Sequence, residues 1–337
     1  MDKEVLLNVE NLSTSFRVGK QNVRIIKDVS FPVYKGRTLA VVGESGCGKS
    51  VTVHSILQLL PRNGMITGGK VTFFKDGKPF ELSAMKRNGP EIRAFRGKDI
   101  GMIFQDPMAS LNPVYKVGVQ VAENLKQHEQ LDKNQLRARV IEMFKKLGIP
   151  DPERRYDAYP HEFSGGMKQR VMIAIAMVCN PDLLIADEPT TALDVTIQAQ
   201  IMELMKKLQV EDGKSIILIT HNMGLVADMA DDVAVMYMGR VMEYGTAEDI
   251  FLHPAHPYTK ALMRSVPVIG DRSQKLETIP GVTPNPAELG DGCEFCNRCE
   301  FACDLCKQGT IEEREVTPGH RVRCIRAVEK EVQNAHE

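Results

Sequence analysis

Short apolar runs alternate with longer amphipathic stretches through the first 250 residues. Continuous apolar runs are typical of strands buried on both faces, and four are expected at 38–42, 99–104, 183–187 and 215–220. Apolar residues at helical spacing predict helical segments within 49–60, 116–148 and 197–208. Shorter strands are expected at 6–9 and 29–33, where Pro32 favours a sheet edge. Strands that alternate with helices predict an α/β core with a largely parallel sheet.

The pattern changes near residue 250. Prolines and glycines punctuate the stretch from Pro254 to Gly292, which is typical of an irregular connection. Six of the eight cysteines then fall between Cys293 and Cys324, and a charged tail follows. The chain is therefore expected to consist of a core domain, 1–250, and a cysteine-rich C-terminal extension, 251–337.

Composition and charge narrow the class of protein. Of the 337 residues, 43% are hydrophobic and 26% charged, which is typical of a soluble globular protein. The net charge of −1 lacks the basic surplus expected of a general nucleic-acid binder. No apolar run approaches the ~18 residues of a membrane span, and the N-terminus lacks the features of a signal peptide. A cytosolic chain is expected, and in a reducing compartment clustered cysteines favour metal or redox chemistry.

Residues 43–50 fit the phosphate-loop pattern G-x-x-x-x-G-K-[ST] in full, between an expected strand and an expected helix. Backbone N–H groups of such a loop and the N-terminus of the following helix bind phosphates. Lys49 is expected to contact the β- and γ-phosphates, and the Ser50 hydroxyl to hold Mg²⁺. The predicted nucleotide-binding residues of this segment are Gly43, Glu44, Ser45, Gly46, Cys47, Gly48, Lys49, Ser50 and Val51.

A second candidate element is the acidic end of the strand expected at 183–187. The strand delivers Asp187 to its tip, where the carboxylate can hold Mg²⁺ directly or through water. Glu188 follows, in a position to orient or deprotonate an attacking water. Two acids at a strand end are common by themselves, but together with the phosphate loop they predict a Mg²⁺-dependent nucleotide site.

Further motifs resemble those of the ABC ATPase family. Residues 163–170, Phe-Ser-Gly-Gly-Met-Lys-Gln-Arg, resemble the family's signature motif. In the family's order, Gln105 resembles the glutamine of the Q-loop, Ala192-Leu193-Asp194 the D-loop, and His221 the switch histidine. Phe16 lies where the family places an aromatic side chain that stacks on adenine.

This resemblance covers about residues 5–250. It implies an α/β fold, the phosphate-loop ABC ATPase core, with a RecA-like mixed sheet and a helical subdomain at about 106–165. The segment 253–262, and later Gly292-Cys293 and Arg298-Cys299, are similar to the C-terminal region of ATP-binding subunits of dipeptide and oligopeptide importers, in particular the D-type subunit.

The resemblance implies that two ATPase subunits pair head to tail, with ATP between the phosphate loop of one and the signature motif of the other. Gln105 would contact Mg²⁺ or the attacking water, and His221 would bind the γ-phosphate and help position Glu188. Asp194 would act across the interface between the subunits. The residues that would contact ATP bound to the partner subunit are Ser164, Gly165 and Gly166.

The same resemblance implies the partners. They are a second ATPase subunit of a different, F-type chain, two transmembrane permease subunits and an extracytoplasmic solute-binding protein, with no nucleic acid. This chain would lie peripherally at the cytoplasmic face of the inner membrane. Dipeptides or oligopeptides are the expected solutes, and nickel, opines or oligosaccharides are the alternatives.

Two functions of other classes compete with a transport ATPase. The first is a soluble ABC ATPase that acts on nucleic acid or ribosomes, which the single cassette and the balanced charge disfavour. The second is a non-enzymatic metal-binding regulator, which the complete set of ATPase motifs disfavours.

The cysteine cluster suits a metal site, because so short a polar segment cannot bury six thiols in a core of its own. The importer resemblance implies four ligands of a [4Fe–4S] cluster, with Cys296 and Cys303 as extra thiols; these ligands are Cys293, Cys299, Cys306 and Cys324. Four thiolates also suit a structural zinc ion, and disulfides or free thiols remain open.

The other two cysteines lie in the core domain. Cys47 lies beside Lys49 and a helix N-terminus, which predicts a lowered thiol pKa and inhibition by thiol reagents. The alternative is a small residue that the loop tolerates. Cys179 lies in an apolar helix and is expected to be a buried, inert thiol.

Overall fold

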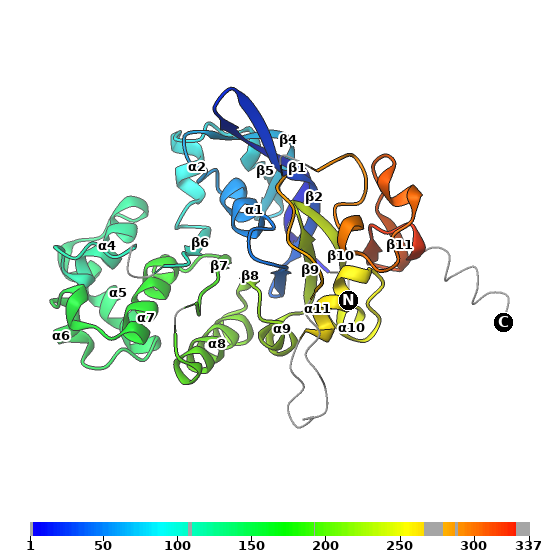
Figure 1. Cartoon of the computed structure of the whole chain (residues 1–337). Helices are drawn as coiled ribbons and strands as arrows, with labels where there is room; N and C mark the ends of the chain where they lie inside the picture. The colour runs from blue at the N-terminus through cyan, green and yellow to red at the C-terminus, as the bar shows by residue number, and fades with distance from the viewer. Residues whose placement is uncertain (1–2, 107–109, 192, 266–278, 287–288, 328–337) are drawn as a thin grey trace. The chain divides into compact units, whose positions relative to one another are not determined.

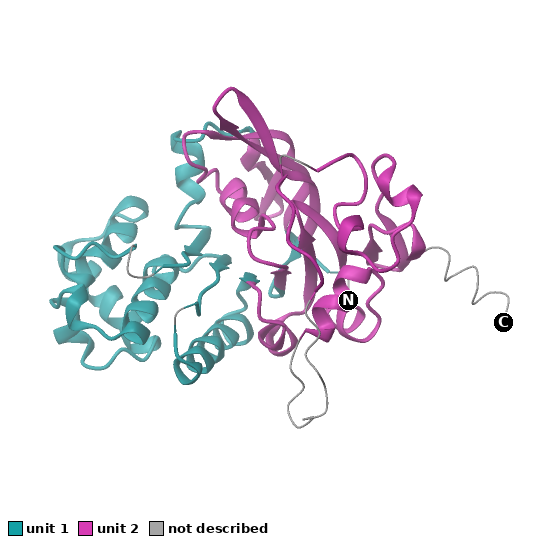
Figure 2. Cartoon of the chain, viewed as in Figure 1, with its two compact units in different colours: residues 1–6, 33–38, 84–219 teal, residues 7–32, 39–83, 220–337 magenta. Residues whose placement is uncertain are grey.

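The structure is a computed structural model of the chain (Figure 1) and describes residues 3–106, 110–191, 193–265, 279–286 and 289–327. The chain forms two compact units, each built from separate stretches of sequence (Figure 2). Unit 1 consists of Met1–Leu6, Val33–Thr38 and Ala84–Ile219. Unit 2 consists of Leu7–Pro32, Leu39–Ser83 and Thr220–Glu337.

Unit 1 contains parallel strands in the order β8-β7-β6, with Thr220 of β8 counted in unit 2. Their bounds are β6 (Ile100–Ile103), β7 (Leu183–Asp187) and β8 (Ser215–Thr220). Every residue of these strands is buried, which explains why the runs are continuously apolar.

The helices of unit 1 follow the predicted periodicity. The helix-prone stretch 116–148 forms two helices, and Val121 and Leu125 of the first and Val140 and Phe144 of the second are buried. The bounds are α2 (Pro90–Phe95), α4 (Val117–His128), α5 (Lys133–Lys146), α6 (Pro152–Tyr156), η2 (Pro160–Glu162), α7 (Gly165–Met177) and α8 (Val195–Val210).

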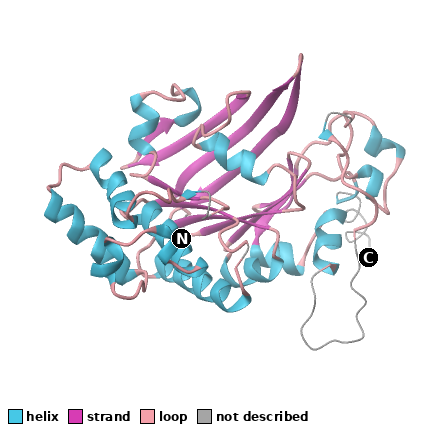
Figure 3. Cartoon of the chain, turned by 60° about the vertical axis from the view of Figure 1, so that its left-hand side comes forward, coloured by secondary structure: helices cyan, strands magenta, loops and turns pink. Residues whose placement is uncertain are grey.

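Unit 2 contains an antiparallel sheet in the order β2-β1-β4-β5, apart from a few strand-end residues that belong to unit 1. The bounds are β1 (Val5–Val18), β2 (Gln21–Tyr34), β4 (Gly64–Lys75) and β5 (Lys78–Glu81), with η1 (Leu82–Ala84) following. Pro32 lies in the edge strand β2, as predicted. The strands predicted at 6–9 and 29–33 are short pieces of β1 and β2, which are much longer. Figure 3 shows the chain coloured by secondary structure, with its strands in magenta.

A second run of strands in unit 2 has the order β11-β12-β10-β9-β3. Strands β3 and β9 pair in parallel, with Val41 opposite Ala234, and the other pairs are antiparallel. The bounds are β3 (Thr38–Val42), β9 (Asp232–Tyr237), β10 (Arg240–Thr246), β11 (Arg314–Thr317) and β12 (His320–Val322). The pairing confirms the mixed sheet that the family resemblance implies, whereas the strand pattern alone, which did not reveal the β9–β10 hairpin, predicted a largely parallel sheet.

The helices of unit 2 are short. Helix α1 ends at Ile56, earlier than the predicted segment 49–60. The bounds are α1 (Lys49–Ile56), α9 (Met223–Met229), α10 (Ala247–Leu252), α11 (Pro257–Arg264), η4 (Cys296–Arg298) and η5 (Asp304–Lys307). Within the described ranges, no helix combines the length and apolarity that crossing a bilayer requires.

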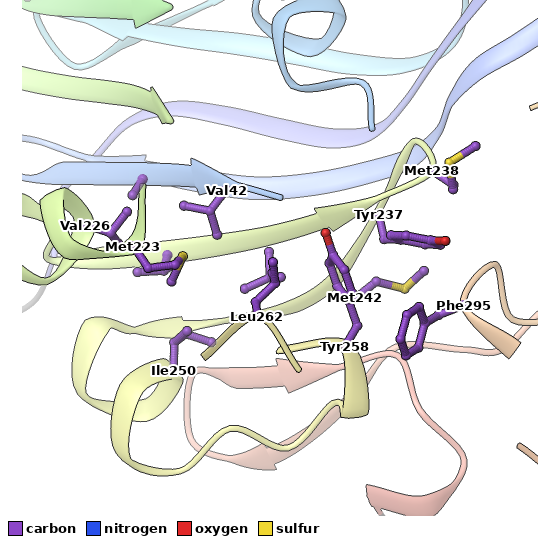
Figure 4. Close-up of a cluster of buried hydrophobic side chains, with 13 residues drawn as sticks. Val42, Met223, Val226, Tyr237, Met238, Met242, Ile250, Tyr258, Leu262 and Phe295 are labelled. Atoms are coloured by element: carbon purple, nitrogen blue, oxygen red, sulfur yellow. The ribbon is translucent and has the colours of Figure 1, made fainter. Parts of the chain in front are cut away.

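The C-terminal extension shares a hydrophobic core with the rest of unit 2. Val42 and Tyr237 of the strands pack in one cluster with Tyr258 and Leu262 of α11 and with Phe295 (Figure 4). Strands β11 and β12 extend the sheet beside β10, where Glu243 lies opposite Val322. The extension is therefore built onto the core of unit 2, and the predicted domain boundary at 250 stays a prediction.

Candidate active site

The phosphate loop joins β3 to α1 in unit 2, as the sequence predicts. Gly43, Gly46 and Gly48 have φ values of 149°, 79° and 105°, which side chains rarely allow. A Cβ atom on Gly43 would lie 2.1 Å from the Met236 carbonyl oxygen. The glycines are thus required by the backbone itself, which turns sharply out of the strand and into the helix.

Lys49 lies inside the loop. Its side chain is 4% exposed, and Nζ donates hydrogen bonds to the carbonyl oxygens of Gly43 (2.8 Å) and Glu44 (3.0 Å). A phosphate in the curve of the loop would meet this ammonium group together with the N-terminus of α1. Ser50 and Val51 form the first turn of that helix, where they were predicted to face Mg²⁺ and phosphate.

The prediction of a lowered pKa for Cys47 is wrong. The Cys47 side chain is 1% exposed, and burial raises the pKa of the thiol despite the nearby Lys49 ammonium. Cys179 lies in the turn after α7 and is only half-buried. Burial raises the pKa of Cys179 to about 11, which agrees with the predicted inert thiol.

The acidic strand end lies in unit 1. Asp187 is the last residue of β7 and is 2% exposed. Glu188 follows with a φ of 45°, and its N–H donates to the Ile219 carbonyl oxygen (3.0 Å). Gln105 Nε2 donates to Glu188 Oε2 (3.3 Å), so the structure brings together two residues predicted from separate motifs.

A third side chain on the Glu188 carboxylate was not predicted. Thr191 Oγ1 donates to Glu188 Oε2 (2.9 Å), the same oxygen that accepts from Gln105. Both donors bind the same carboxylate oxygen and so restrain the orientation of the group. The three-residue spacing of Thr191 from Glu188 after a strand end was the signal available in the sequence.

The signature motif begins α7. Ser164 is the N-cap residue and accepts a hydrogen bond from the Met167 N–H (3.4 Å), and both Ser164 and Gly165 are exposed. Gly166 is buried against Ile197 of α8. Asp194 caps α8 by accepting from the Ile197 N–H (3.0 Å). Ala192 of the D-loop lies outside the described residues.

Phe16 and His221 belong to unit 2. The Phe16 ring is half-buried and lies over Gly64 of β4, where an added Cβ would be 3.0 Å from it. His221 follows β8 directly and is exposed. It precedes Asn222, the N-cap residue of α9. The roles of Phe16 toward adenine and of His221 toward Glu188 stay predictions.

The four cysteines predicted as ligands line one cavity in unit 2. The cysteines that line this cavity are Cys293, Cys296, Cys299, Cys306 and Cys324. The remaining wall includes apolar side chains and two arginines, Arg323 and Arg326, whose charge suits a group with several thiolates. In the described part of the chain, no three acidic, histidine or cysteine side chains converge as they do around a single ion.

The thiols differ in their surroundings. Burial raises the pKa of Cys293 to about 12 and also raises the pKa of Cys299, Cys306 and Cys324. Cys303 is not part of the cavity lining. Its Sγ lies 3.5 Å from that of Cys306, and hydrogen bonds from Cys306 lower its pKa. Of the two predicted extra thiols, Cys303 lies outside the cavity lining, whereas Cys296 lines the cavity together with the four predicted ligands, and the ligand set stays a prediction.

A phosphate loop with a buried lysine and an acidic strand end whose glutamate is bound by Gln105 define a phosphate-loop ATPase. The model of the ABC transporter family matches residues 26–191, and that of the oligopeptide/dipeptide transporter C-terminal region matches residues 242–306. A solved ATP-binding cassette, MJ0796, in a dimeric post-hydrolysis state bound to ADP and phosphate, matches with a TM-score of 0.62 at 27% identity. That match covers 72% of this chain and 99% of the cassette.

Two relatives match over nearly the whole chain. The dipeptide transport ATP-binding protein DppD of Bacillus subtilis is 48% identical over 322 residues, which cover 95% of this chain and 94% of that protein. The oligopeptide transport ATP-binding protein OppD of Haemophilus influenzae is 48% identical over 302 residues, covering 90% and 91%. The chain belongs to the family of ATP-binding subunits of ABC-type dipeptide and oligopeptide importers, and it is an ATPase of that class.

Proposed function

We propose that this chain binds Mg²⁺-ATP on its phosphate loop and hydrolyses it to drive peptide uptake through separate membrane subunits. The observation that carries the hydrolytic role is the Glu188 carboxylate, held by Gln105 and Thr191 at the end of β7. Two donors on one carboxylate oxygen fix the orientation of the carboxylate, and the proposed role of Glu188 is to accept a proton from the attacking water. Asp187 and Ser50 are the proposed protein ligands of Mg²⁺, with Gln105 contacting the ion or the water.

The catalytic site is proposed to be completed by a second ATPase subunit. Ser164 and Gly165 are exposed at the N-terminus of α7, where backbone N–H groups can bind the γ-phosphate of ATP on a partner. Asp194 lies at the start of α8, which packs against α7 through Ile197. The partner is proposed to be a different, F-type chain.

The remaining partners are proposed to be two permease subunits and an extracytoplasmic solute-binding protein, with this chain at the cytoplasmic face of the membrane. Support comes from the C-terminal region, which matches the oligopeptide/dipeptide transporter model. The names of the relatives refer to dipeptides and oligopeptides, and peptides are the proposed solute class.

We also infer that Cys293, Cys299, Cys306 and Cys324 hold a [4Fe–4S] cluster. Support comes from the single cavity that these thiols share and from its two arginines, which would offset the negative charge of four thiolates. Such a group, when bound, would supply covalent cross-links in a segment with few regular elements. A structural zinc ion is the alternative that metal analysis distinguishes.

Substitution of the proposed catalytic base tests the hydrolytic role. Glu188→Gln is expected to abolish ATP turnover while leaving Mg²⁺-ATP binding within a few-fold of the wild type, and Lys49→Ala is expected to abolish binding. Glu142→Gln, on the exposed side of α5, is the matched control and should hydrolyse ATP normally. Normal turnover by Glu188→Gln would rule out Glu188 as the base.

Metal analysis tests the cysteine site. Anaerobically purified protein is expected to contain about four iron and four sulfide per chain, with cluster absorbance. Cys306→Ser should lose the iron, whereas Cys303→Ser, which alters the neighbouring thiol outside the cavity, should keep it. A content of one zinc ion per chain and no sulfide would show that the site holds a structural zinc ion and not an iron–sulfur cluster.

A further inference from the structure

One arginine links the cysteine segment to the phosphate loop. Arg298 is the last residue of η4, between Cys296 and Cys299, and it is 9% exposed. Its guanidinium binds the Glu44 carboxylate through two hydrogen bonds, Nη1 to Oε2 at 2.5 Å and Nη2 to Oε1 at 3.0 Å. Glu44 is the second residue of the phosphate loop, so the pair joins positions 254 residues apart in the chain.

All five N–H groups of the guanidinium have an acceptor within unit 2. Besides Glu44, Nε donates to the Pro280 carbonyl oxygen (2.8 Å), Nη2 to that of Ile279 (3.3 Å), and Nη1 to the Tyr237 hydroxyl (3.2 Å). Only a planar fork with five donors can satisfy this set, and a lysine ammonium cannot. The segment around Pro280 therefore fixes the arginine in the orientation that meets Glu44.

The backbone of Glu44 is also held by the C-terminal extension. The Glu44 N–H donates to the Tyr258 hydroxyl (2.9 Å), and Tyr258 is fully buried on α11. Phe295, between Cys293 and Cys296, packs against Tyr258 and Tyr237 with ring centroids 5.2 Å and 5.3 Å apart (Figure 4). Both the side chain and the backbone of this loop residue thus depend on the C-terminal extension.

The charge of Glu44 gives this contact a consequence for nucleotide binding. A carboxylate in a loop that binds phosphates repels them unless a cation neutralises it and holds it aside. Arg298 supplies that cation. The Glu44 carbonyl oxygen accepts from Lys49 Nζ (3.0 Å), so the placement of this residue also affects the lysine that would meet the phosphates.

We propose that Arg298 is a positioning residue for the phosphate loop and that it makes ATP affinity depend on the folded cysteine segment. This inference rests on the proposed nucleotide and metal sites. An intact segment holds Phe295 and Arg298 against Tyr237, Tyr258 and Glu44. Loss of the group that joins the cysteines would release Arg298, leave the Glu44 carboxylate unpaired beside the phosphates, and weaken ATP binding.

The test measures the Kd for Mg²⁺-ATP of the purified full-length chain by calorimetry. Arg298→Met is expected to raise the Kd roughly 10- to 100-fold, the range that corresponds to losing hydrogen bonds to a charged group. Arg298→Lys should recover little of this loss, since it cannot form the fork. Arg264→Met is the matched control, because Arg264 pairs with Glu300 on the surface of unit 2 and should leave the Kd unchanged.

The second half of the test separates electrostatic positioning from general damage to the fold. Glu44→Gln in the Arg298→Met background should restore most of the affinity, because the unpaired negative charge is then gone. Equal Kd values for Arg298→Met and the wild type, or no recovery in the double variant, would overturn the proposal. Failure of the wild type to bind ATP would instead overturn the proposed function, and this inference with it.

The dependence on the cysteine segment has its own readout. Cys306→Ser, checked for iron and zinc, should bind ATP as weakly as Arg298→Met, whereas Cys303→Ser should bind as the wild type does. Arg298→Met itself should retain the metal content of the wild type. A metal-depleted Cys306→Ser protein with wild-type affinity would show that the two sites are uncoupled.

Discussion

Gly165 and Gly166 are the first two residues of helix α7. Replacing Gly166 by alanine is expected to lower stability, whereas replacing Gly165 by alanine is expected to lower turnover. A Cβ on Gly166 would lie 2.8 Å from Ile197 Cγ2, and this atom is attached directly to the Cβ of Ile197, so it cannot swing away freely. A Cβ on Gly165 would lie 3.9 Å from Leu193 Cδ2, an ordinary contact. Gly166→Ala therefore forces α7 and α8 apart, and Gly165→Ala does not.

The magnitudes follow from these contacts. Overpacking of this kind costs about 1–3 kcal/mol, and at roughly 2–4 °C per kcal/mol Gly166→Ala should lower Tm by about 2–12 °C. Gly165→Ala should stay within about 0.5 kcal/mol of the wild type in stability. If the exposed Gly165 contacts the γ-phosphate of ATP bound to a partner, its added methyl group displaces the phosphate, and turnover should fall about 100-fold.

Nucleotide-free thermal melts and ATPase assays of the assembled transporter measure the two effects separately. The double variant Gly166→Ala/Ile197→Ala should melt no lower than Ile197→Ala alone, because the clashing side chain is absent. A wild-type melting temperature for Gly166→Ala would refute the packing argument. Normal turnover by Gly165→Ala would refute its proposed place beside the γ-phosphate.

Three further predictions concern buried groups of unit 2. Limiting N-ethylmaleimide at pH 7.5 should label Cys303 before Cys47, whose pKa is raised by burial, and mass spectrometry locates the label. Glu243→Gln should destabilise the protein by about 2–4 kcal/mol, because the NH₂ group of the new glutamine would face the backbone N–H of Ala255 or His256. The control Glu248→Gln, at an exposed position, should melt normally. Burial lowers the pKa of His256 to about 4, below its unfolded value, so stability is expected to decrease as pH falls from about 6.5 towards 4. His256→Asn, which keeps the acceptor that caps α11, should flatten that dependence in denaturant titrations.

Much of the nucleotide site could be predicted because its requirements are local. Gly43 must be glycine for reasons of backbone geometry, and the loop pattern contains that information within eight residues. The Gln105–Glu188 pair was predicted as two separate motifs, and the structure adds that their side chains meet. Thr191 was missed because its three-residue spacing from Glu188, the signal available in the sequence, does not by itself show that the hydroxyl meets the carboxylate.

The errors concern properties that depend on tertiary packing. The pKa of Cys47 was inferred from sequence neighbours, but burial has the larger effect and no local pattern reveals it. The β9–β10 hairpin was missed although Met238 and Gly239, with φ values of 45° and 83°, form a tight turn between two apolar runs. The strand pattern alone predicted a largely parallel sheet, whereas the mixed sheet that the family resemblance implies is confirmed by this hairpin.

Glu44 shows why the phosphate-loop pattern alone gives an incomplete account of the site. The pattern leaves this position unspecified, and an acid beside a phosphate is unfavourable when considered within the loop. The structure supplies the missing cation from Arg298. The 24% exposed Glu44 side chain is compatible with the loop because a segment at the other end of the chain neutralises it. The identity of a residue at an unspecified position is thus determined by its partner in space, and substitutions at Glu44 and Arg298 must be interpreted as a pair.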